Sequence, residues 1–255
     1  MIDLHCHVLP GIDDGPRDAD ESIALLTGAA RSGVRVVAAT PHLRPDHPGV
    51  DVAELSERCE RLARQLPPDV RVELVPAAEV DPLFAQGLSD EVLRLASYGQ
   101  CGTDMLVETP YGGLPPNFEE LLFAITVRGF RILLAHPERS ADLQARPERL
   151  EDLVRRGVLL QITAPALLAR RRAPARRLAM ALIERGLAHV LASDAHSARG
   201  PRPPTLGAAV KAASDVDARR ARWMVEDAPA AILAGEPLPP APAGRPRGLI
   251  RRRPR

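Results

Sequence analysis

Residues 1–15 read MIDLHCHVLPGIDDG and place two histidines and two aspartates at the end of one short apolar run. Apolar and polar residues alternate over positions 2–8, which predicts a β-strand because neighbouring side chains of a strand point to opposite faces. His5 and His7 then share one face while Cys6 points to the other, and two neutral imidazoles at this spacing can bind one metal ion. An H-x-H pair alone is weak support for a metal site, so whether His5 and His7 bind a metal depends on the residues at the ends of the other predicted strands.

The composition of the 255-residue chain is typical of a soluble globular protein, with 45% hydrophobic and 26% charged residues. The formal net charge of +1 gives no strong field for nucleic acid. Cys6, Cys59 and Cys101 form no C-x-x-C pair, which favours a reducing compartment. Because the N-terminus lacks a leader pattern and no apolar run reaches roughly eighteen residues, we expect no membrane span and a cytoplasmic location.

Short apolar runs alternate with amphipathic stretches along most of the chain. The apolar runs are 2–6, 34–40, 70–77, 104–109, 130–136, 157–163 and 188–194. The amphipathic stretches, which we predict to be helices, are 18–32, 51–65, 89–98, 117–129, 147–156 and 174–185. This alternation predicts an α/β fold with a parallel sheet buried on both faces. Seven strand–helix units favour a TIM-like barrel, with an open sheet as the alternative.

The C-terminal part of the sequence has a different character. Residues 205–234 predict two or three further helices, in which Trp223 is most simply a packing residue. Residues 237–255 are rich in proline and arginine without apolar periodicity, so we predict a disordered tail after a domain of residues 1–236. The basic end could contact an acidic surface, but a solubilising tail is the simpler interpretation.

Histidines and acids gather at the carboxyl ends of the predicted strands. In α/β barrels these ends converge on one edge, and burying many imidazoles and carboxylates together is costly without a cation. The candidate ligands are His5, His7, Asp14, His42, Glu79, Glu108, His136, Asp194 and His196. Because one zinc ion uses about three or four ligands, this set suits two or three metals with a bridging carboxylate. Nitrogen and oxygen ligands without thiolate fit Mn, Fe, Zn or Mg, whereas His47 and His189 are expected to lie outside the site.

Several motifs of the sequence form a recognisable set. They are HCH at 5–7, DDGP at 13–16 with Glu21 and Ser22, TPH at 40–42, Glu79, ETP at 108–110, AHPER at 135–139 and SDAH at 193–196. Together they resemble the PHP (polymerase and histidinol phosphatase) superfamily. Within it the sequence is similar to the bacterial metal-dependent protein-tyrosine phosphatases of capsule and exopolysaccharide clusters, from residue 1 to about residue 235.

The resemblance implies a distorted seven-stranded β/α barrel, the PHP fold, with three divalent metal ions, most simply manganese. The implied ligands are His5, His7 and Asp194 for one ion, Glu79, Glu108 and His136 for a second that Glu79 links to the first, and Asp14, His42 and His196 for the third. Arg139 and Arg202 are implied to bind substrate phosphate, although the R-P-P stretch of Arg202 lies one residue further along than in the family. Residues 163–166 read TAPA, where the family has a glycine–serine pair.

The implied reaction is hydrolysis of phosphotyrosine on a protein, with an autophosphorylating bacterial tyrosine kinase of polysaccharide export as the implied partner. Metal ions lower the pKa of a bridging water and neutralise the phosphoryl oxygens, while a phenolate with a parent pKa of about 10 leaves readily. A thiolate mechanism with an arginine six residues after the cysteine is excluded, because Ile12, Gln65 and Val107 occupy these positions.

Three alternatives remain open at the level of sequence. A small-molecule phosphatase, for example one acting on histidinol phosphate, would share the metals and differ in the pocket. A nuclease would need stacking side chains, and aromatic residues make up only 3% of the chain. A metal-stabilised scaffold module without activity is the alternative from another class, and the oligomeric state is not predicted.

Overall fold

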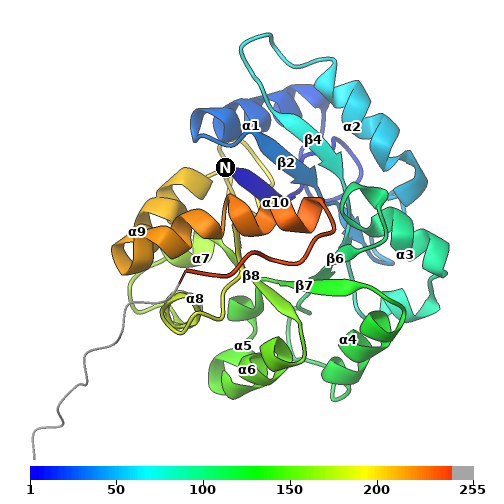
Figure 1. Cartoon of the computed structure of the whole chain (residues 1–255). Coiled ribbons are helices and arrows are strands. Elements are labelled where there is room, and N and C mark those ends of the chain that lie inside the picture. Colours follow the sequence, from blue (N-terminus) through cyan, green and yellow to red (C-terminus); the bar gives the residue numbers. More distant parts are fainter. Residues whose placement is uncertain (243–255) are drawn as a thin grey trace, which may run out of the picture.

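The computed structural model describes residues 1–242, in which parallel strands alternate with helices (Figure 1). The strands are β1 (Ile2–Cys6), β2 (Val36–Ala39), β3 (His42–Leu43), β4 (Glu73–Pro76), β5 (Glu79–Val80), β6 (Asp104–Glu108), β7 (Arg131–Ala135), β8 (Leu159–Thr163) and β9 (Val190–Ala192). Each predicted apolar run therefore contains a strand, and β3 and β5 are short continuations that the sequence did not predict. The predicted α/β class with parallel pairing is confirmed.

The strands divide between two sheets, with the orders β1-β2-β4 and β3-β5-β6-β7-β8-β9. The division between β2 and β3 falls at Thr40-Pro41, because proline has no N–H to continue a ladder. A bridge between Cys6 and Ala195 joins the outer strands of the two sheets, next to a hydrogen bond of 2.8 Å from Asp194 N to His5 O. Within residues 1–242 these ladders do not form the single closed seven-stranded barrel that the sequence analysis favoured.

The predicted helices all form. They are α1 (Ala19–Arg31), α2 (Leu55–Ala63), α3 (Asp90–Ala96), α4 (Phe118–Val127), α6 (Glu148–Arg155) and α8 (Pro174–Glu184), and the terminal pair is α9 (Leu206–Trp223) and α10 (Asp227–Leu233). Short α5 (Ala141–Ala145), α7 (Ala164–Leu168) and the 3₁₀ turns η1 (Val52–Glu54), η2 (Phe84–Gly87), η3 (Tyr98–Gln100) and η4 (Pro137–Arg139) were not predicted. Gly33, Gly129, Gly157 and Gly186 follow helices with positive φ, as expected of glycine C-terminal caps.

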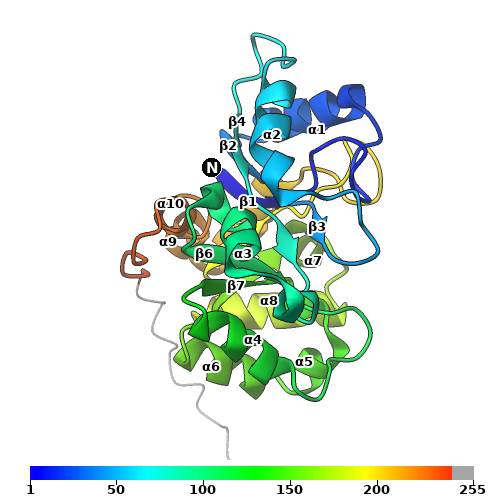
Figure 2. The same ribbon diagram turned by 90° about the vertical axis from the view of Figure 1, so that its right-hand side faces the viewer.

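The apolar core has two parts, one enclosed by the strands and one beneath the helices. The enclosed part includes Leu4, Leu106 and Leu133, and Tyr98 and Ile232 contribute to it from outside the strands. Helices α1 and α2 lie at one end of the molecule and α4, α5 and α6 at the other in both views (Figures 1 and 2). Helix α10 packs on β1, so this part of the interior is sealed where the strands begin.

The C-terminal end of the chain is described only in part. Trp223 is buried, in agreement with its predicted packing role. Residues 237–242 of the predicted tail contain neither helix nor strand, and residues 243–255 lie outside the described residues. The helices found in residues 1–242 are too short or too polar to cross a membrane.

Candidate metal centre

All of the predicted ligands lie together where the strands end, and all except Asp14 are buried. Their ligand atoms form overlapping groups within 4.8 Å: His7, Asp14, His42 and His196; His5, Glu79 and His136; His5, His7 and Asp194; and His42, Glu79 and Glu108. The acidic ligands lie two positions after residues of the enclosed core, as Glu108 lies after Leu106 in β6. Because side chains alternate along a strand, residues two positions apart point to the same, inner face. The apolar interior thus gives way to a polar centre at the carboxyl ends.

Strand β1 and the residue after it supply two imidazoles, those of His5 and His7, whose Nε2 atoms lie 3.2 Å apart. Gln161 fixes one of them, because its Nε2 donates to Ile162 O and its Oε1 lies 3.0 Å from His5 Nδ1. Asp13 fixes the other, because its Oδ2 lies 2.7 Å from His7 Nδ1. In the neutral tautomer in which each Nδ1–H donates outward, both Nε2 lone pairs point into the centre, as they do in metal sites.

Glu79 is fully buried and contacts imidazoles from three other segments of the centre. Its Oε2 lies 3.2 Å from His5 Nε2 and 3.0 Å from His42 Nδ1, while its Oε1 lies 2.7 Å from His136 Nε2. Burial raises the pKa of this carboxyl, but the charges of His5 and His136 outweigh it and hold the pKa well below the usual range. The ionised carboxylate therefore presents its two oxygens to different imidazoles, which is the arrangement of a bridging ligand.

Glu108 lies beside Glu79 and His42. Burial, and then the negative charge of Glu79, raise the pKa of Glu108 to about 7. Arg44 Nη1 donates to both carboxylate oxygens of Glu108 at 3.1 and 3.2 Å. Two neighbouring carboxylates in a buried site repel each other unless positive charge lies close by, and here Arg44 provides it.

His196 and Asp14 form the part of the centre nearest the solvent. His196 Nδ1 donates to Asp194 O at 3.0 Å, so its Nε2, which lies 3.1 Å from Asp14 Oδ1, is free to act as a ligand. Burial, and then the charge of His7, lower the pKa of His196 to about 4, and the ring is neutral at pH 7. The side chain of Asp14 is 42% exposed, so this side of the centre is open to a substrate.

Two residues of the centre have a strained backbone. His136 has a φ of 38° and Asp194 a φ of 51°, in the left-handed region that residues other than glycine seldom adopt. Such a conformation costs about 1–3 kcal/mol and is concentrated at functional sites. Both residues come directly after a strand or one residue beyond it, and the strained turns direct their side chains into the centre.

The two predicted phosphate-binding arginines both reach the centre. Arg139 pairs with Asp194 through Nη2, and its Nη1 donates to Tyr111 Oη at 3.0 Å. Arg202 Nη2 donates to Asp14 Oδ2 at 2.7 Å, and its Nη1 lies 3.8 Å from Asp194 Oδ1. Their guanidinium groups therefore lie beside carboxylates of the centre, within reach of an anion held there.

The donor set fits divalent cations. Several buried atoms have no hydrogen-bond partner, including Glu79 Oε2, His136 Nδ1 and His196 Nε2, and buried polar atoms are otherwise almost always paired. The donors are imidazole nitrogens and carboxylate oxygens, and the one nearby thiol, Cys6, points its Sγ at Ala195 O. A cation would satisfy the unpaired atoms and relieve the repulsion between facing lone pairs.

Sequence reasoning missed several neighbours of the centre. His47, expected to lie outside, stacks on His42 with ring centroids 5.3 Å apart, although it joins none of the ligand groups. Arg44 and Tyr111 lie in loops that carry no strand-end signal. The spacing of the DDG motif could have identified Asp13, because a carboxylate next to a ligand commonly orients a histidine. His189, by contrast, lies at the start of β9 as expected.

Comparisons with known proteins identify the family of the chain. The family model described as capsular polysaccharide synthesis, CpsB/CapC, matches residues 1–234. The tyrosine-protein phosphatase YwqE of Bacillus subtilis is 30% identical over 200 residues, which cover 78% of each chain. The tyrosine-protein phosphatase CpsB of Streptococcus pneumoniae is 27% identical over 250 residues, which cover 91% of this chain and 98% of the relative.

Solved structures extend the comparison to the fold. One of the crystal structures of YwqE from Bacillus subtilis and CpsB from Streptococcus pneumoniae, described as unique metal-dependent tyrosine phosphatases, superposes on this chain with a TM-score of 0.80. It is 28% identical and covers 96% of this chain and 100% of the solved chain. A β-aspartyl dipeptidase of Fervidobacterium islandicum, 13% identical with a TM-score of 0.61, shares the fold alone; the match covers 91% of this chain and 72% of that one.

Proposed function

The chain belongs to the CpsB/CapC family of capsular polysaccharide synthesis, and from this premise we propose how it acts as a metal-dependent tyrosine-protein phosphatase. As in the relatives named tyrosine-protein phosphatases, the reaction is hydrolysis of a phosphoric monoester on a protein tyrosine. The observation that carries the proposal is the buried carboxylate of Glu79, whose two oxygens each face imidazole nitrogens from other strands.

Three divalent ions, most simply manganese, are proposed for the centre. His5, His7 and Asp194 would hold the first, Glu79, Glu108 and His136 the second, with Glu79 also touching the first, and Asp14, His42 and His196 the third. Two groups of ligand atoms, His5 with His7 and Asp194, and His7 with Asp14, His42 and His196, support the first and third sites. For the second site, Glu79 belongs to one group with His136 and to another with Glu108. When bound, such ions supply Lewis acidity and a nucleophile at neutral pH.

The protein's own side chains bind and orient the substrate. Arg139, which Tyr111 Oη holds at 3.0 Å, would donate two parallel hydrogen bonds to the phosphoryl oxygens, a geometry that guanidinium matches. Arg202 would contact the same group from the solvent side. Asp13 and Gln161 keep the β1 imidazoles in the tautomer that faces the centre. A phenolate needs little proton donation to leave, so no separate general acid is required.

The proposed setting is that of a bacterial tyrosine autokinase in polysaccharide export, which would supply the phosphotyrosine. A reducing, cytoplasmic compartment suits Cys6, Cys59 and Cys101, which are all unpaired. We further infer that residues 1–236 form the catalytic domain. In it the two sheets would act as one distorted seven-stranded barrel, since the bridge between Cys6 and Ala195 links their outer strands.

A kinetic comparison tests this function. The manganese-loaded protein is assayed with a phosphotyrosyl peptide and with histidinol phosphate, and we expect a clear preference in kcat/KM for the peptide. A large preference for histidinol phosphate would replace the proposal with a small-molecule phosphatase. Metal-loaded protein that hydrolyses no phosphoester would instead support a metal-stabilised scaffold module.

A further inference from the structure

The segment between α7 and α8, together with the first turn of α8, is the most strongly basic stretch of residues 1–242. Residues 170–177 read RRRAPARR, and no acidic residue occurs from position 163 to position 183. We call residues 170–177 the arginine loop. Its Arg170, Arg171, Arg172 and Arg177 are exposed, and within residues 1–242 none of them has an ion-pair partner. Several other exposed arginines, such as Arg61 with Glu57, pair with an acid on their own helix.

The arginine loop is linked to the candidate metal centre through β8, which precedes it, and α8, which follows it. Thr163, at the end of β8, donates through N and Oγ1 to Glu138 Oε1 at 2.9 and 2.8 Å. Helix α8, which the loop enters, packs on η4, the turn that carries Arg139. Gln144 Nε2 donates to Glu138 O at 2.8 Å, and Gln144 faces the first turn of α8. The loop is therefore connected to the phosphate-binding arginine through one short chain of contacts.

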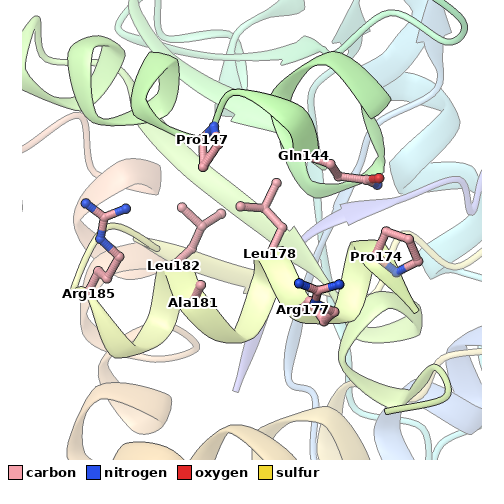
Figure 3. A pocket seen from close by; sticks show the side chains of 8 residues that line it. All are labelled: Gln144, Pro147, Pro174, Arg177, Leu178, Ala181, Leu182 and Arg185. Carbon is pink, nitrogen blue, oxygen red and sulfur yellow. The ribbon is translucent and has the colours of Figure 1, made fainter. Parts of the chain in front are cut away.

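A groove continues from the arginine loop along α8. Its volume is about 260 Å³, with an apolar floor of Leu178, Ala181 and Leu182. Figure 3 shows Arg177 and Arg185 on α8 on either side of this floor, and Pro147 and Gln144 across from it. The two arginines are eight positions apart along α8 and its C-cap, which corresponds to about 12 Å, or about four residues of extended peptide.

We infer that the arginine loop binds acidic side chains that flank the phosphotyrosine in the protein substrate, an inference that rests on the proposed function. Guanidinium groups bind carboxylates through paired hydrogen bonds, and unpaired arginines lose no existing partner when they do so. A groove with an apolar floor fits a peptide side chain, whereas adsorption to an anionic membrane needs no groove. The positive charge of the arginine loop thus complements a bound peptide that carries acidic residues in the part running from the phosphotyrosine towards α8.

The test compares two phosphotyrosyl peptides of equal length, one with Glu and Asp around the tyrosine and one with Gln and Asn. For the manganese-loaded protein we expect about tenfold higher kcat/KM for the acidic peptide at low salt, with a smaller ratio at high salt. The variant R171Q/R172Q/R177Q is expected to bring the ratio close to one. Because these side chains are exposed and unpaired, the variant should keep the wild-type thermal unfolding temperature.

A matched control removes the same charge from the opposite end of the strands. Arg31, Arg35 and Arg71 are exposed near the starts of β2 and β4, and R31Q/R35Q/R71Q should keep the wild-type ratio. Equal loss in both triple variants would show a general effect of net charge and overturn the inference. A wild-type ratio near one would overturn it as well.

Two further measurements separate this inference from the proposed function. If neither peptide is hydrolysed, the proposed function fails. Fluorescence anisotropy with a labelled, unphosphorylated acidic peptide then still reports on the loop, with binding expected for the wild type and the control and lost in R171Q/R172Q/R177Q. Loop-dependent sedimentation with phosphatidylglycerol vesicles, without any preference for the acidic peptide, would assign the loop to a membrane surface and overturn the inference.

Discussion

The two ends of the strands bury charge in opposite ways. At the amino ends, the buried carboxylate of Asp104 accepts from Arg131 Nε at 2.6 Å and from Arg131 Nη2 at 2.9 Å, so its charge is matched within the protein. At the carboxyl ends, Glu79 lies among imidazoles with an oxygen that no hydrogen bond satisfies. The first arrangement is satisfied within the protein, whereas the second leaves a carboxylate oxygen that a cation would satisfy. The contrast fits our proposal that the amino ends serve stability and the carboxyl ends serve binding and catalysis.

Two histidines on either side of β9 show the same contrast. Burial is the main cause that lowers the pKa of both His189 and His196 to about 4. At the amino end, His189 Nδ1 accepts from Leu160 N at 3.1 Å. At the carboxyl end, His196 Nε2 has no hydrogen-bond partner and points towards Asp14. Both rings are neutral, but only His196 keeps its lone pair available for a metal.

The largest effect is expected from His136→Ala at the carboxyl ends. Loss of a proposed ligand removes several kcal/mol of transition-state stabilisation, so turnover of a phosphotyrosyl peptide should fall at least about a thousandfold. Circular dichroism should show that the variant still folds. Because His136 has a φ of 38°, His136→Asn, which tolerates this conformation, controls for backbone strain and should be equally inactive. Wild-type activity in either variant would contradict the assignment.

Arg139→Ala should have the next largest effect. Hydrogen bonds to charged groups contribute about 1.5–3 kcal/mol each, so kcat/KM should fall about a hundredfold while the metal content stays unchanged. Arg139→Lys keeps the charge but not the paired donors, and it should recover only part of the loss. If lysine restored the full rate, charge alone would explain the role of Arg139.

At the amino ends, Arg131→Met should change stability and leave catalysis intact. The variant leaves the buried carboxyl of Asp104 without its partner, and we expect a loss of about 2 kcal/mol in the free energy of unfolding, measured in urea. This is less than for a fully buried pair, because the Arg131 side chain is 28% exposed. The rate per folded molecule should equal that of the wild type, and a large loss of turnover would erase the contrast between the two ends.

The smallest effect concerns acid stability through His189. Its pKa lies near 4 in the folded protein, against about 6.5 when unfolded. The unfolded chain therefore takes up a proton first, so the contribution is complete above about pH 6.5 and is lost as the pH falls towards 4. Between pH 7 and pH 5, the free energy of unfolding of the wild type should fall by about 1 kcal/mol more than that of His189→Asn. If the wild type and His189→Asn lost the same stability with falling pH, the His189 ring would be solvated in the folded protein.

The features that depend on local sequence pattern could be predicted from the sequence. Apolar runs and glycine stops predicted the strands and the main helices, and the polar residues that follow each run predicted the candidate ligands, which lie together in the structure. Loops were less predictable, because the path of a loop depends on tertiary contacts. Arg44 and Tyr111 reach the centre from loops. The sheets divide at Pro41 because β2 pairs with β4 and β3 pairs with β5, a difference in pairing that the sequence does not show.

The central claim is that the carboxyl ends of the strands are complete only with cations, and metal removal tests it most directly. The purified protein is stripped with a chelator, and the metal content and the hydrolysis of a phosphotyrosyl peptide are then followed during titration with Mn²⁺. We predict that activity falls to background with the metal and returns as about three ions bind per chain, the number the proposed ligand groups provide for. Protein that keeps its full rate while its metal content is negligible would contradict the account.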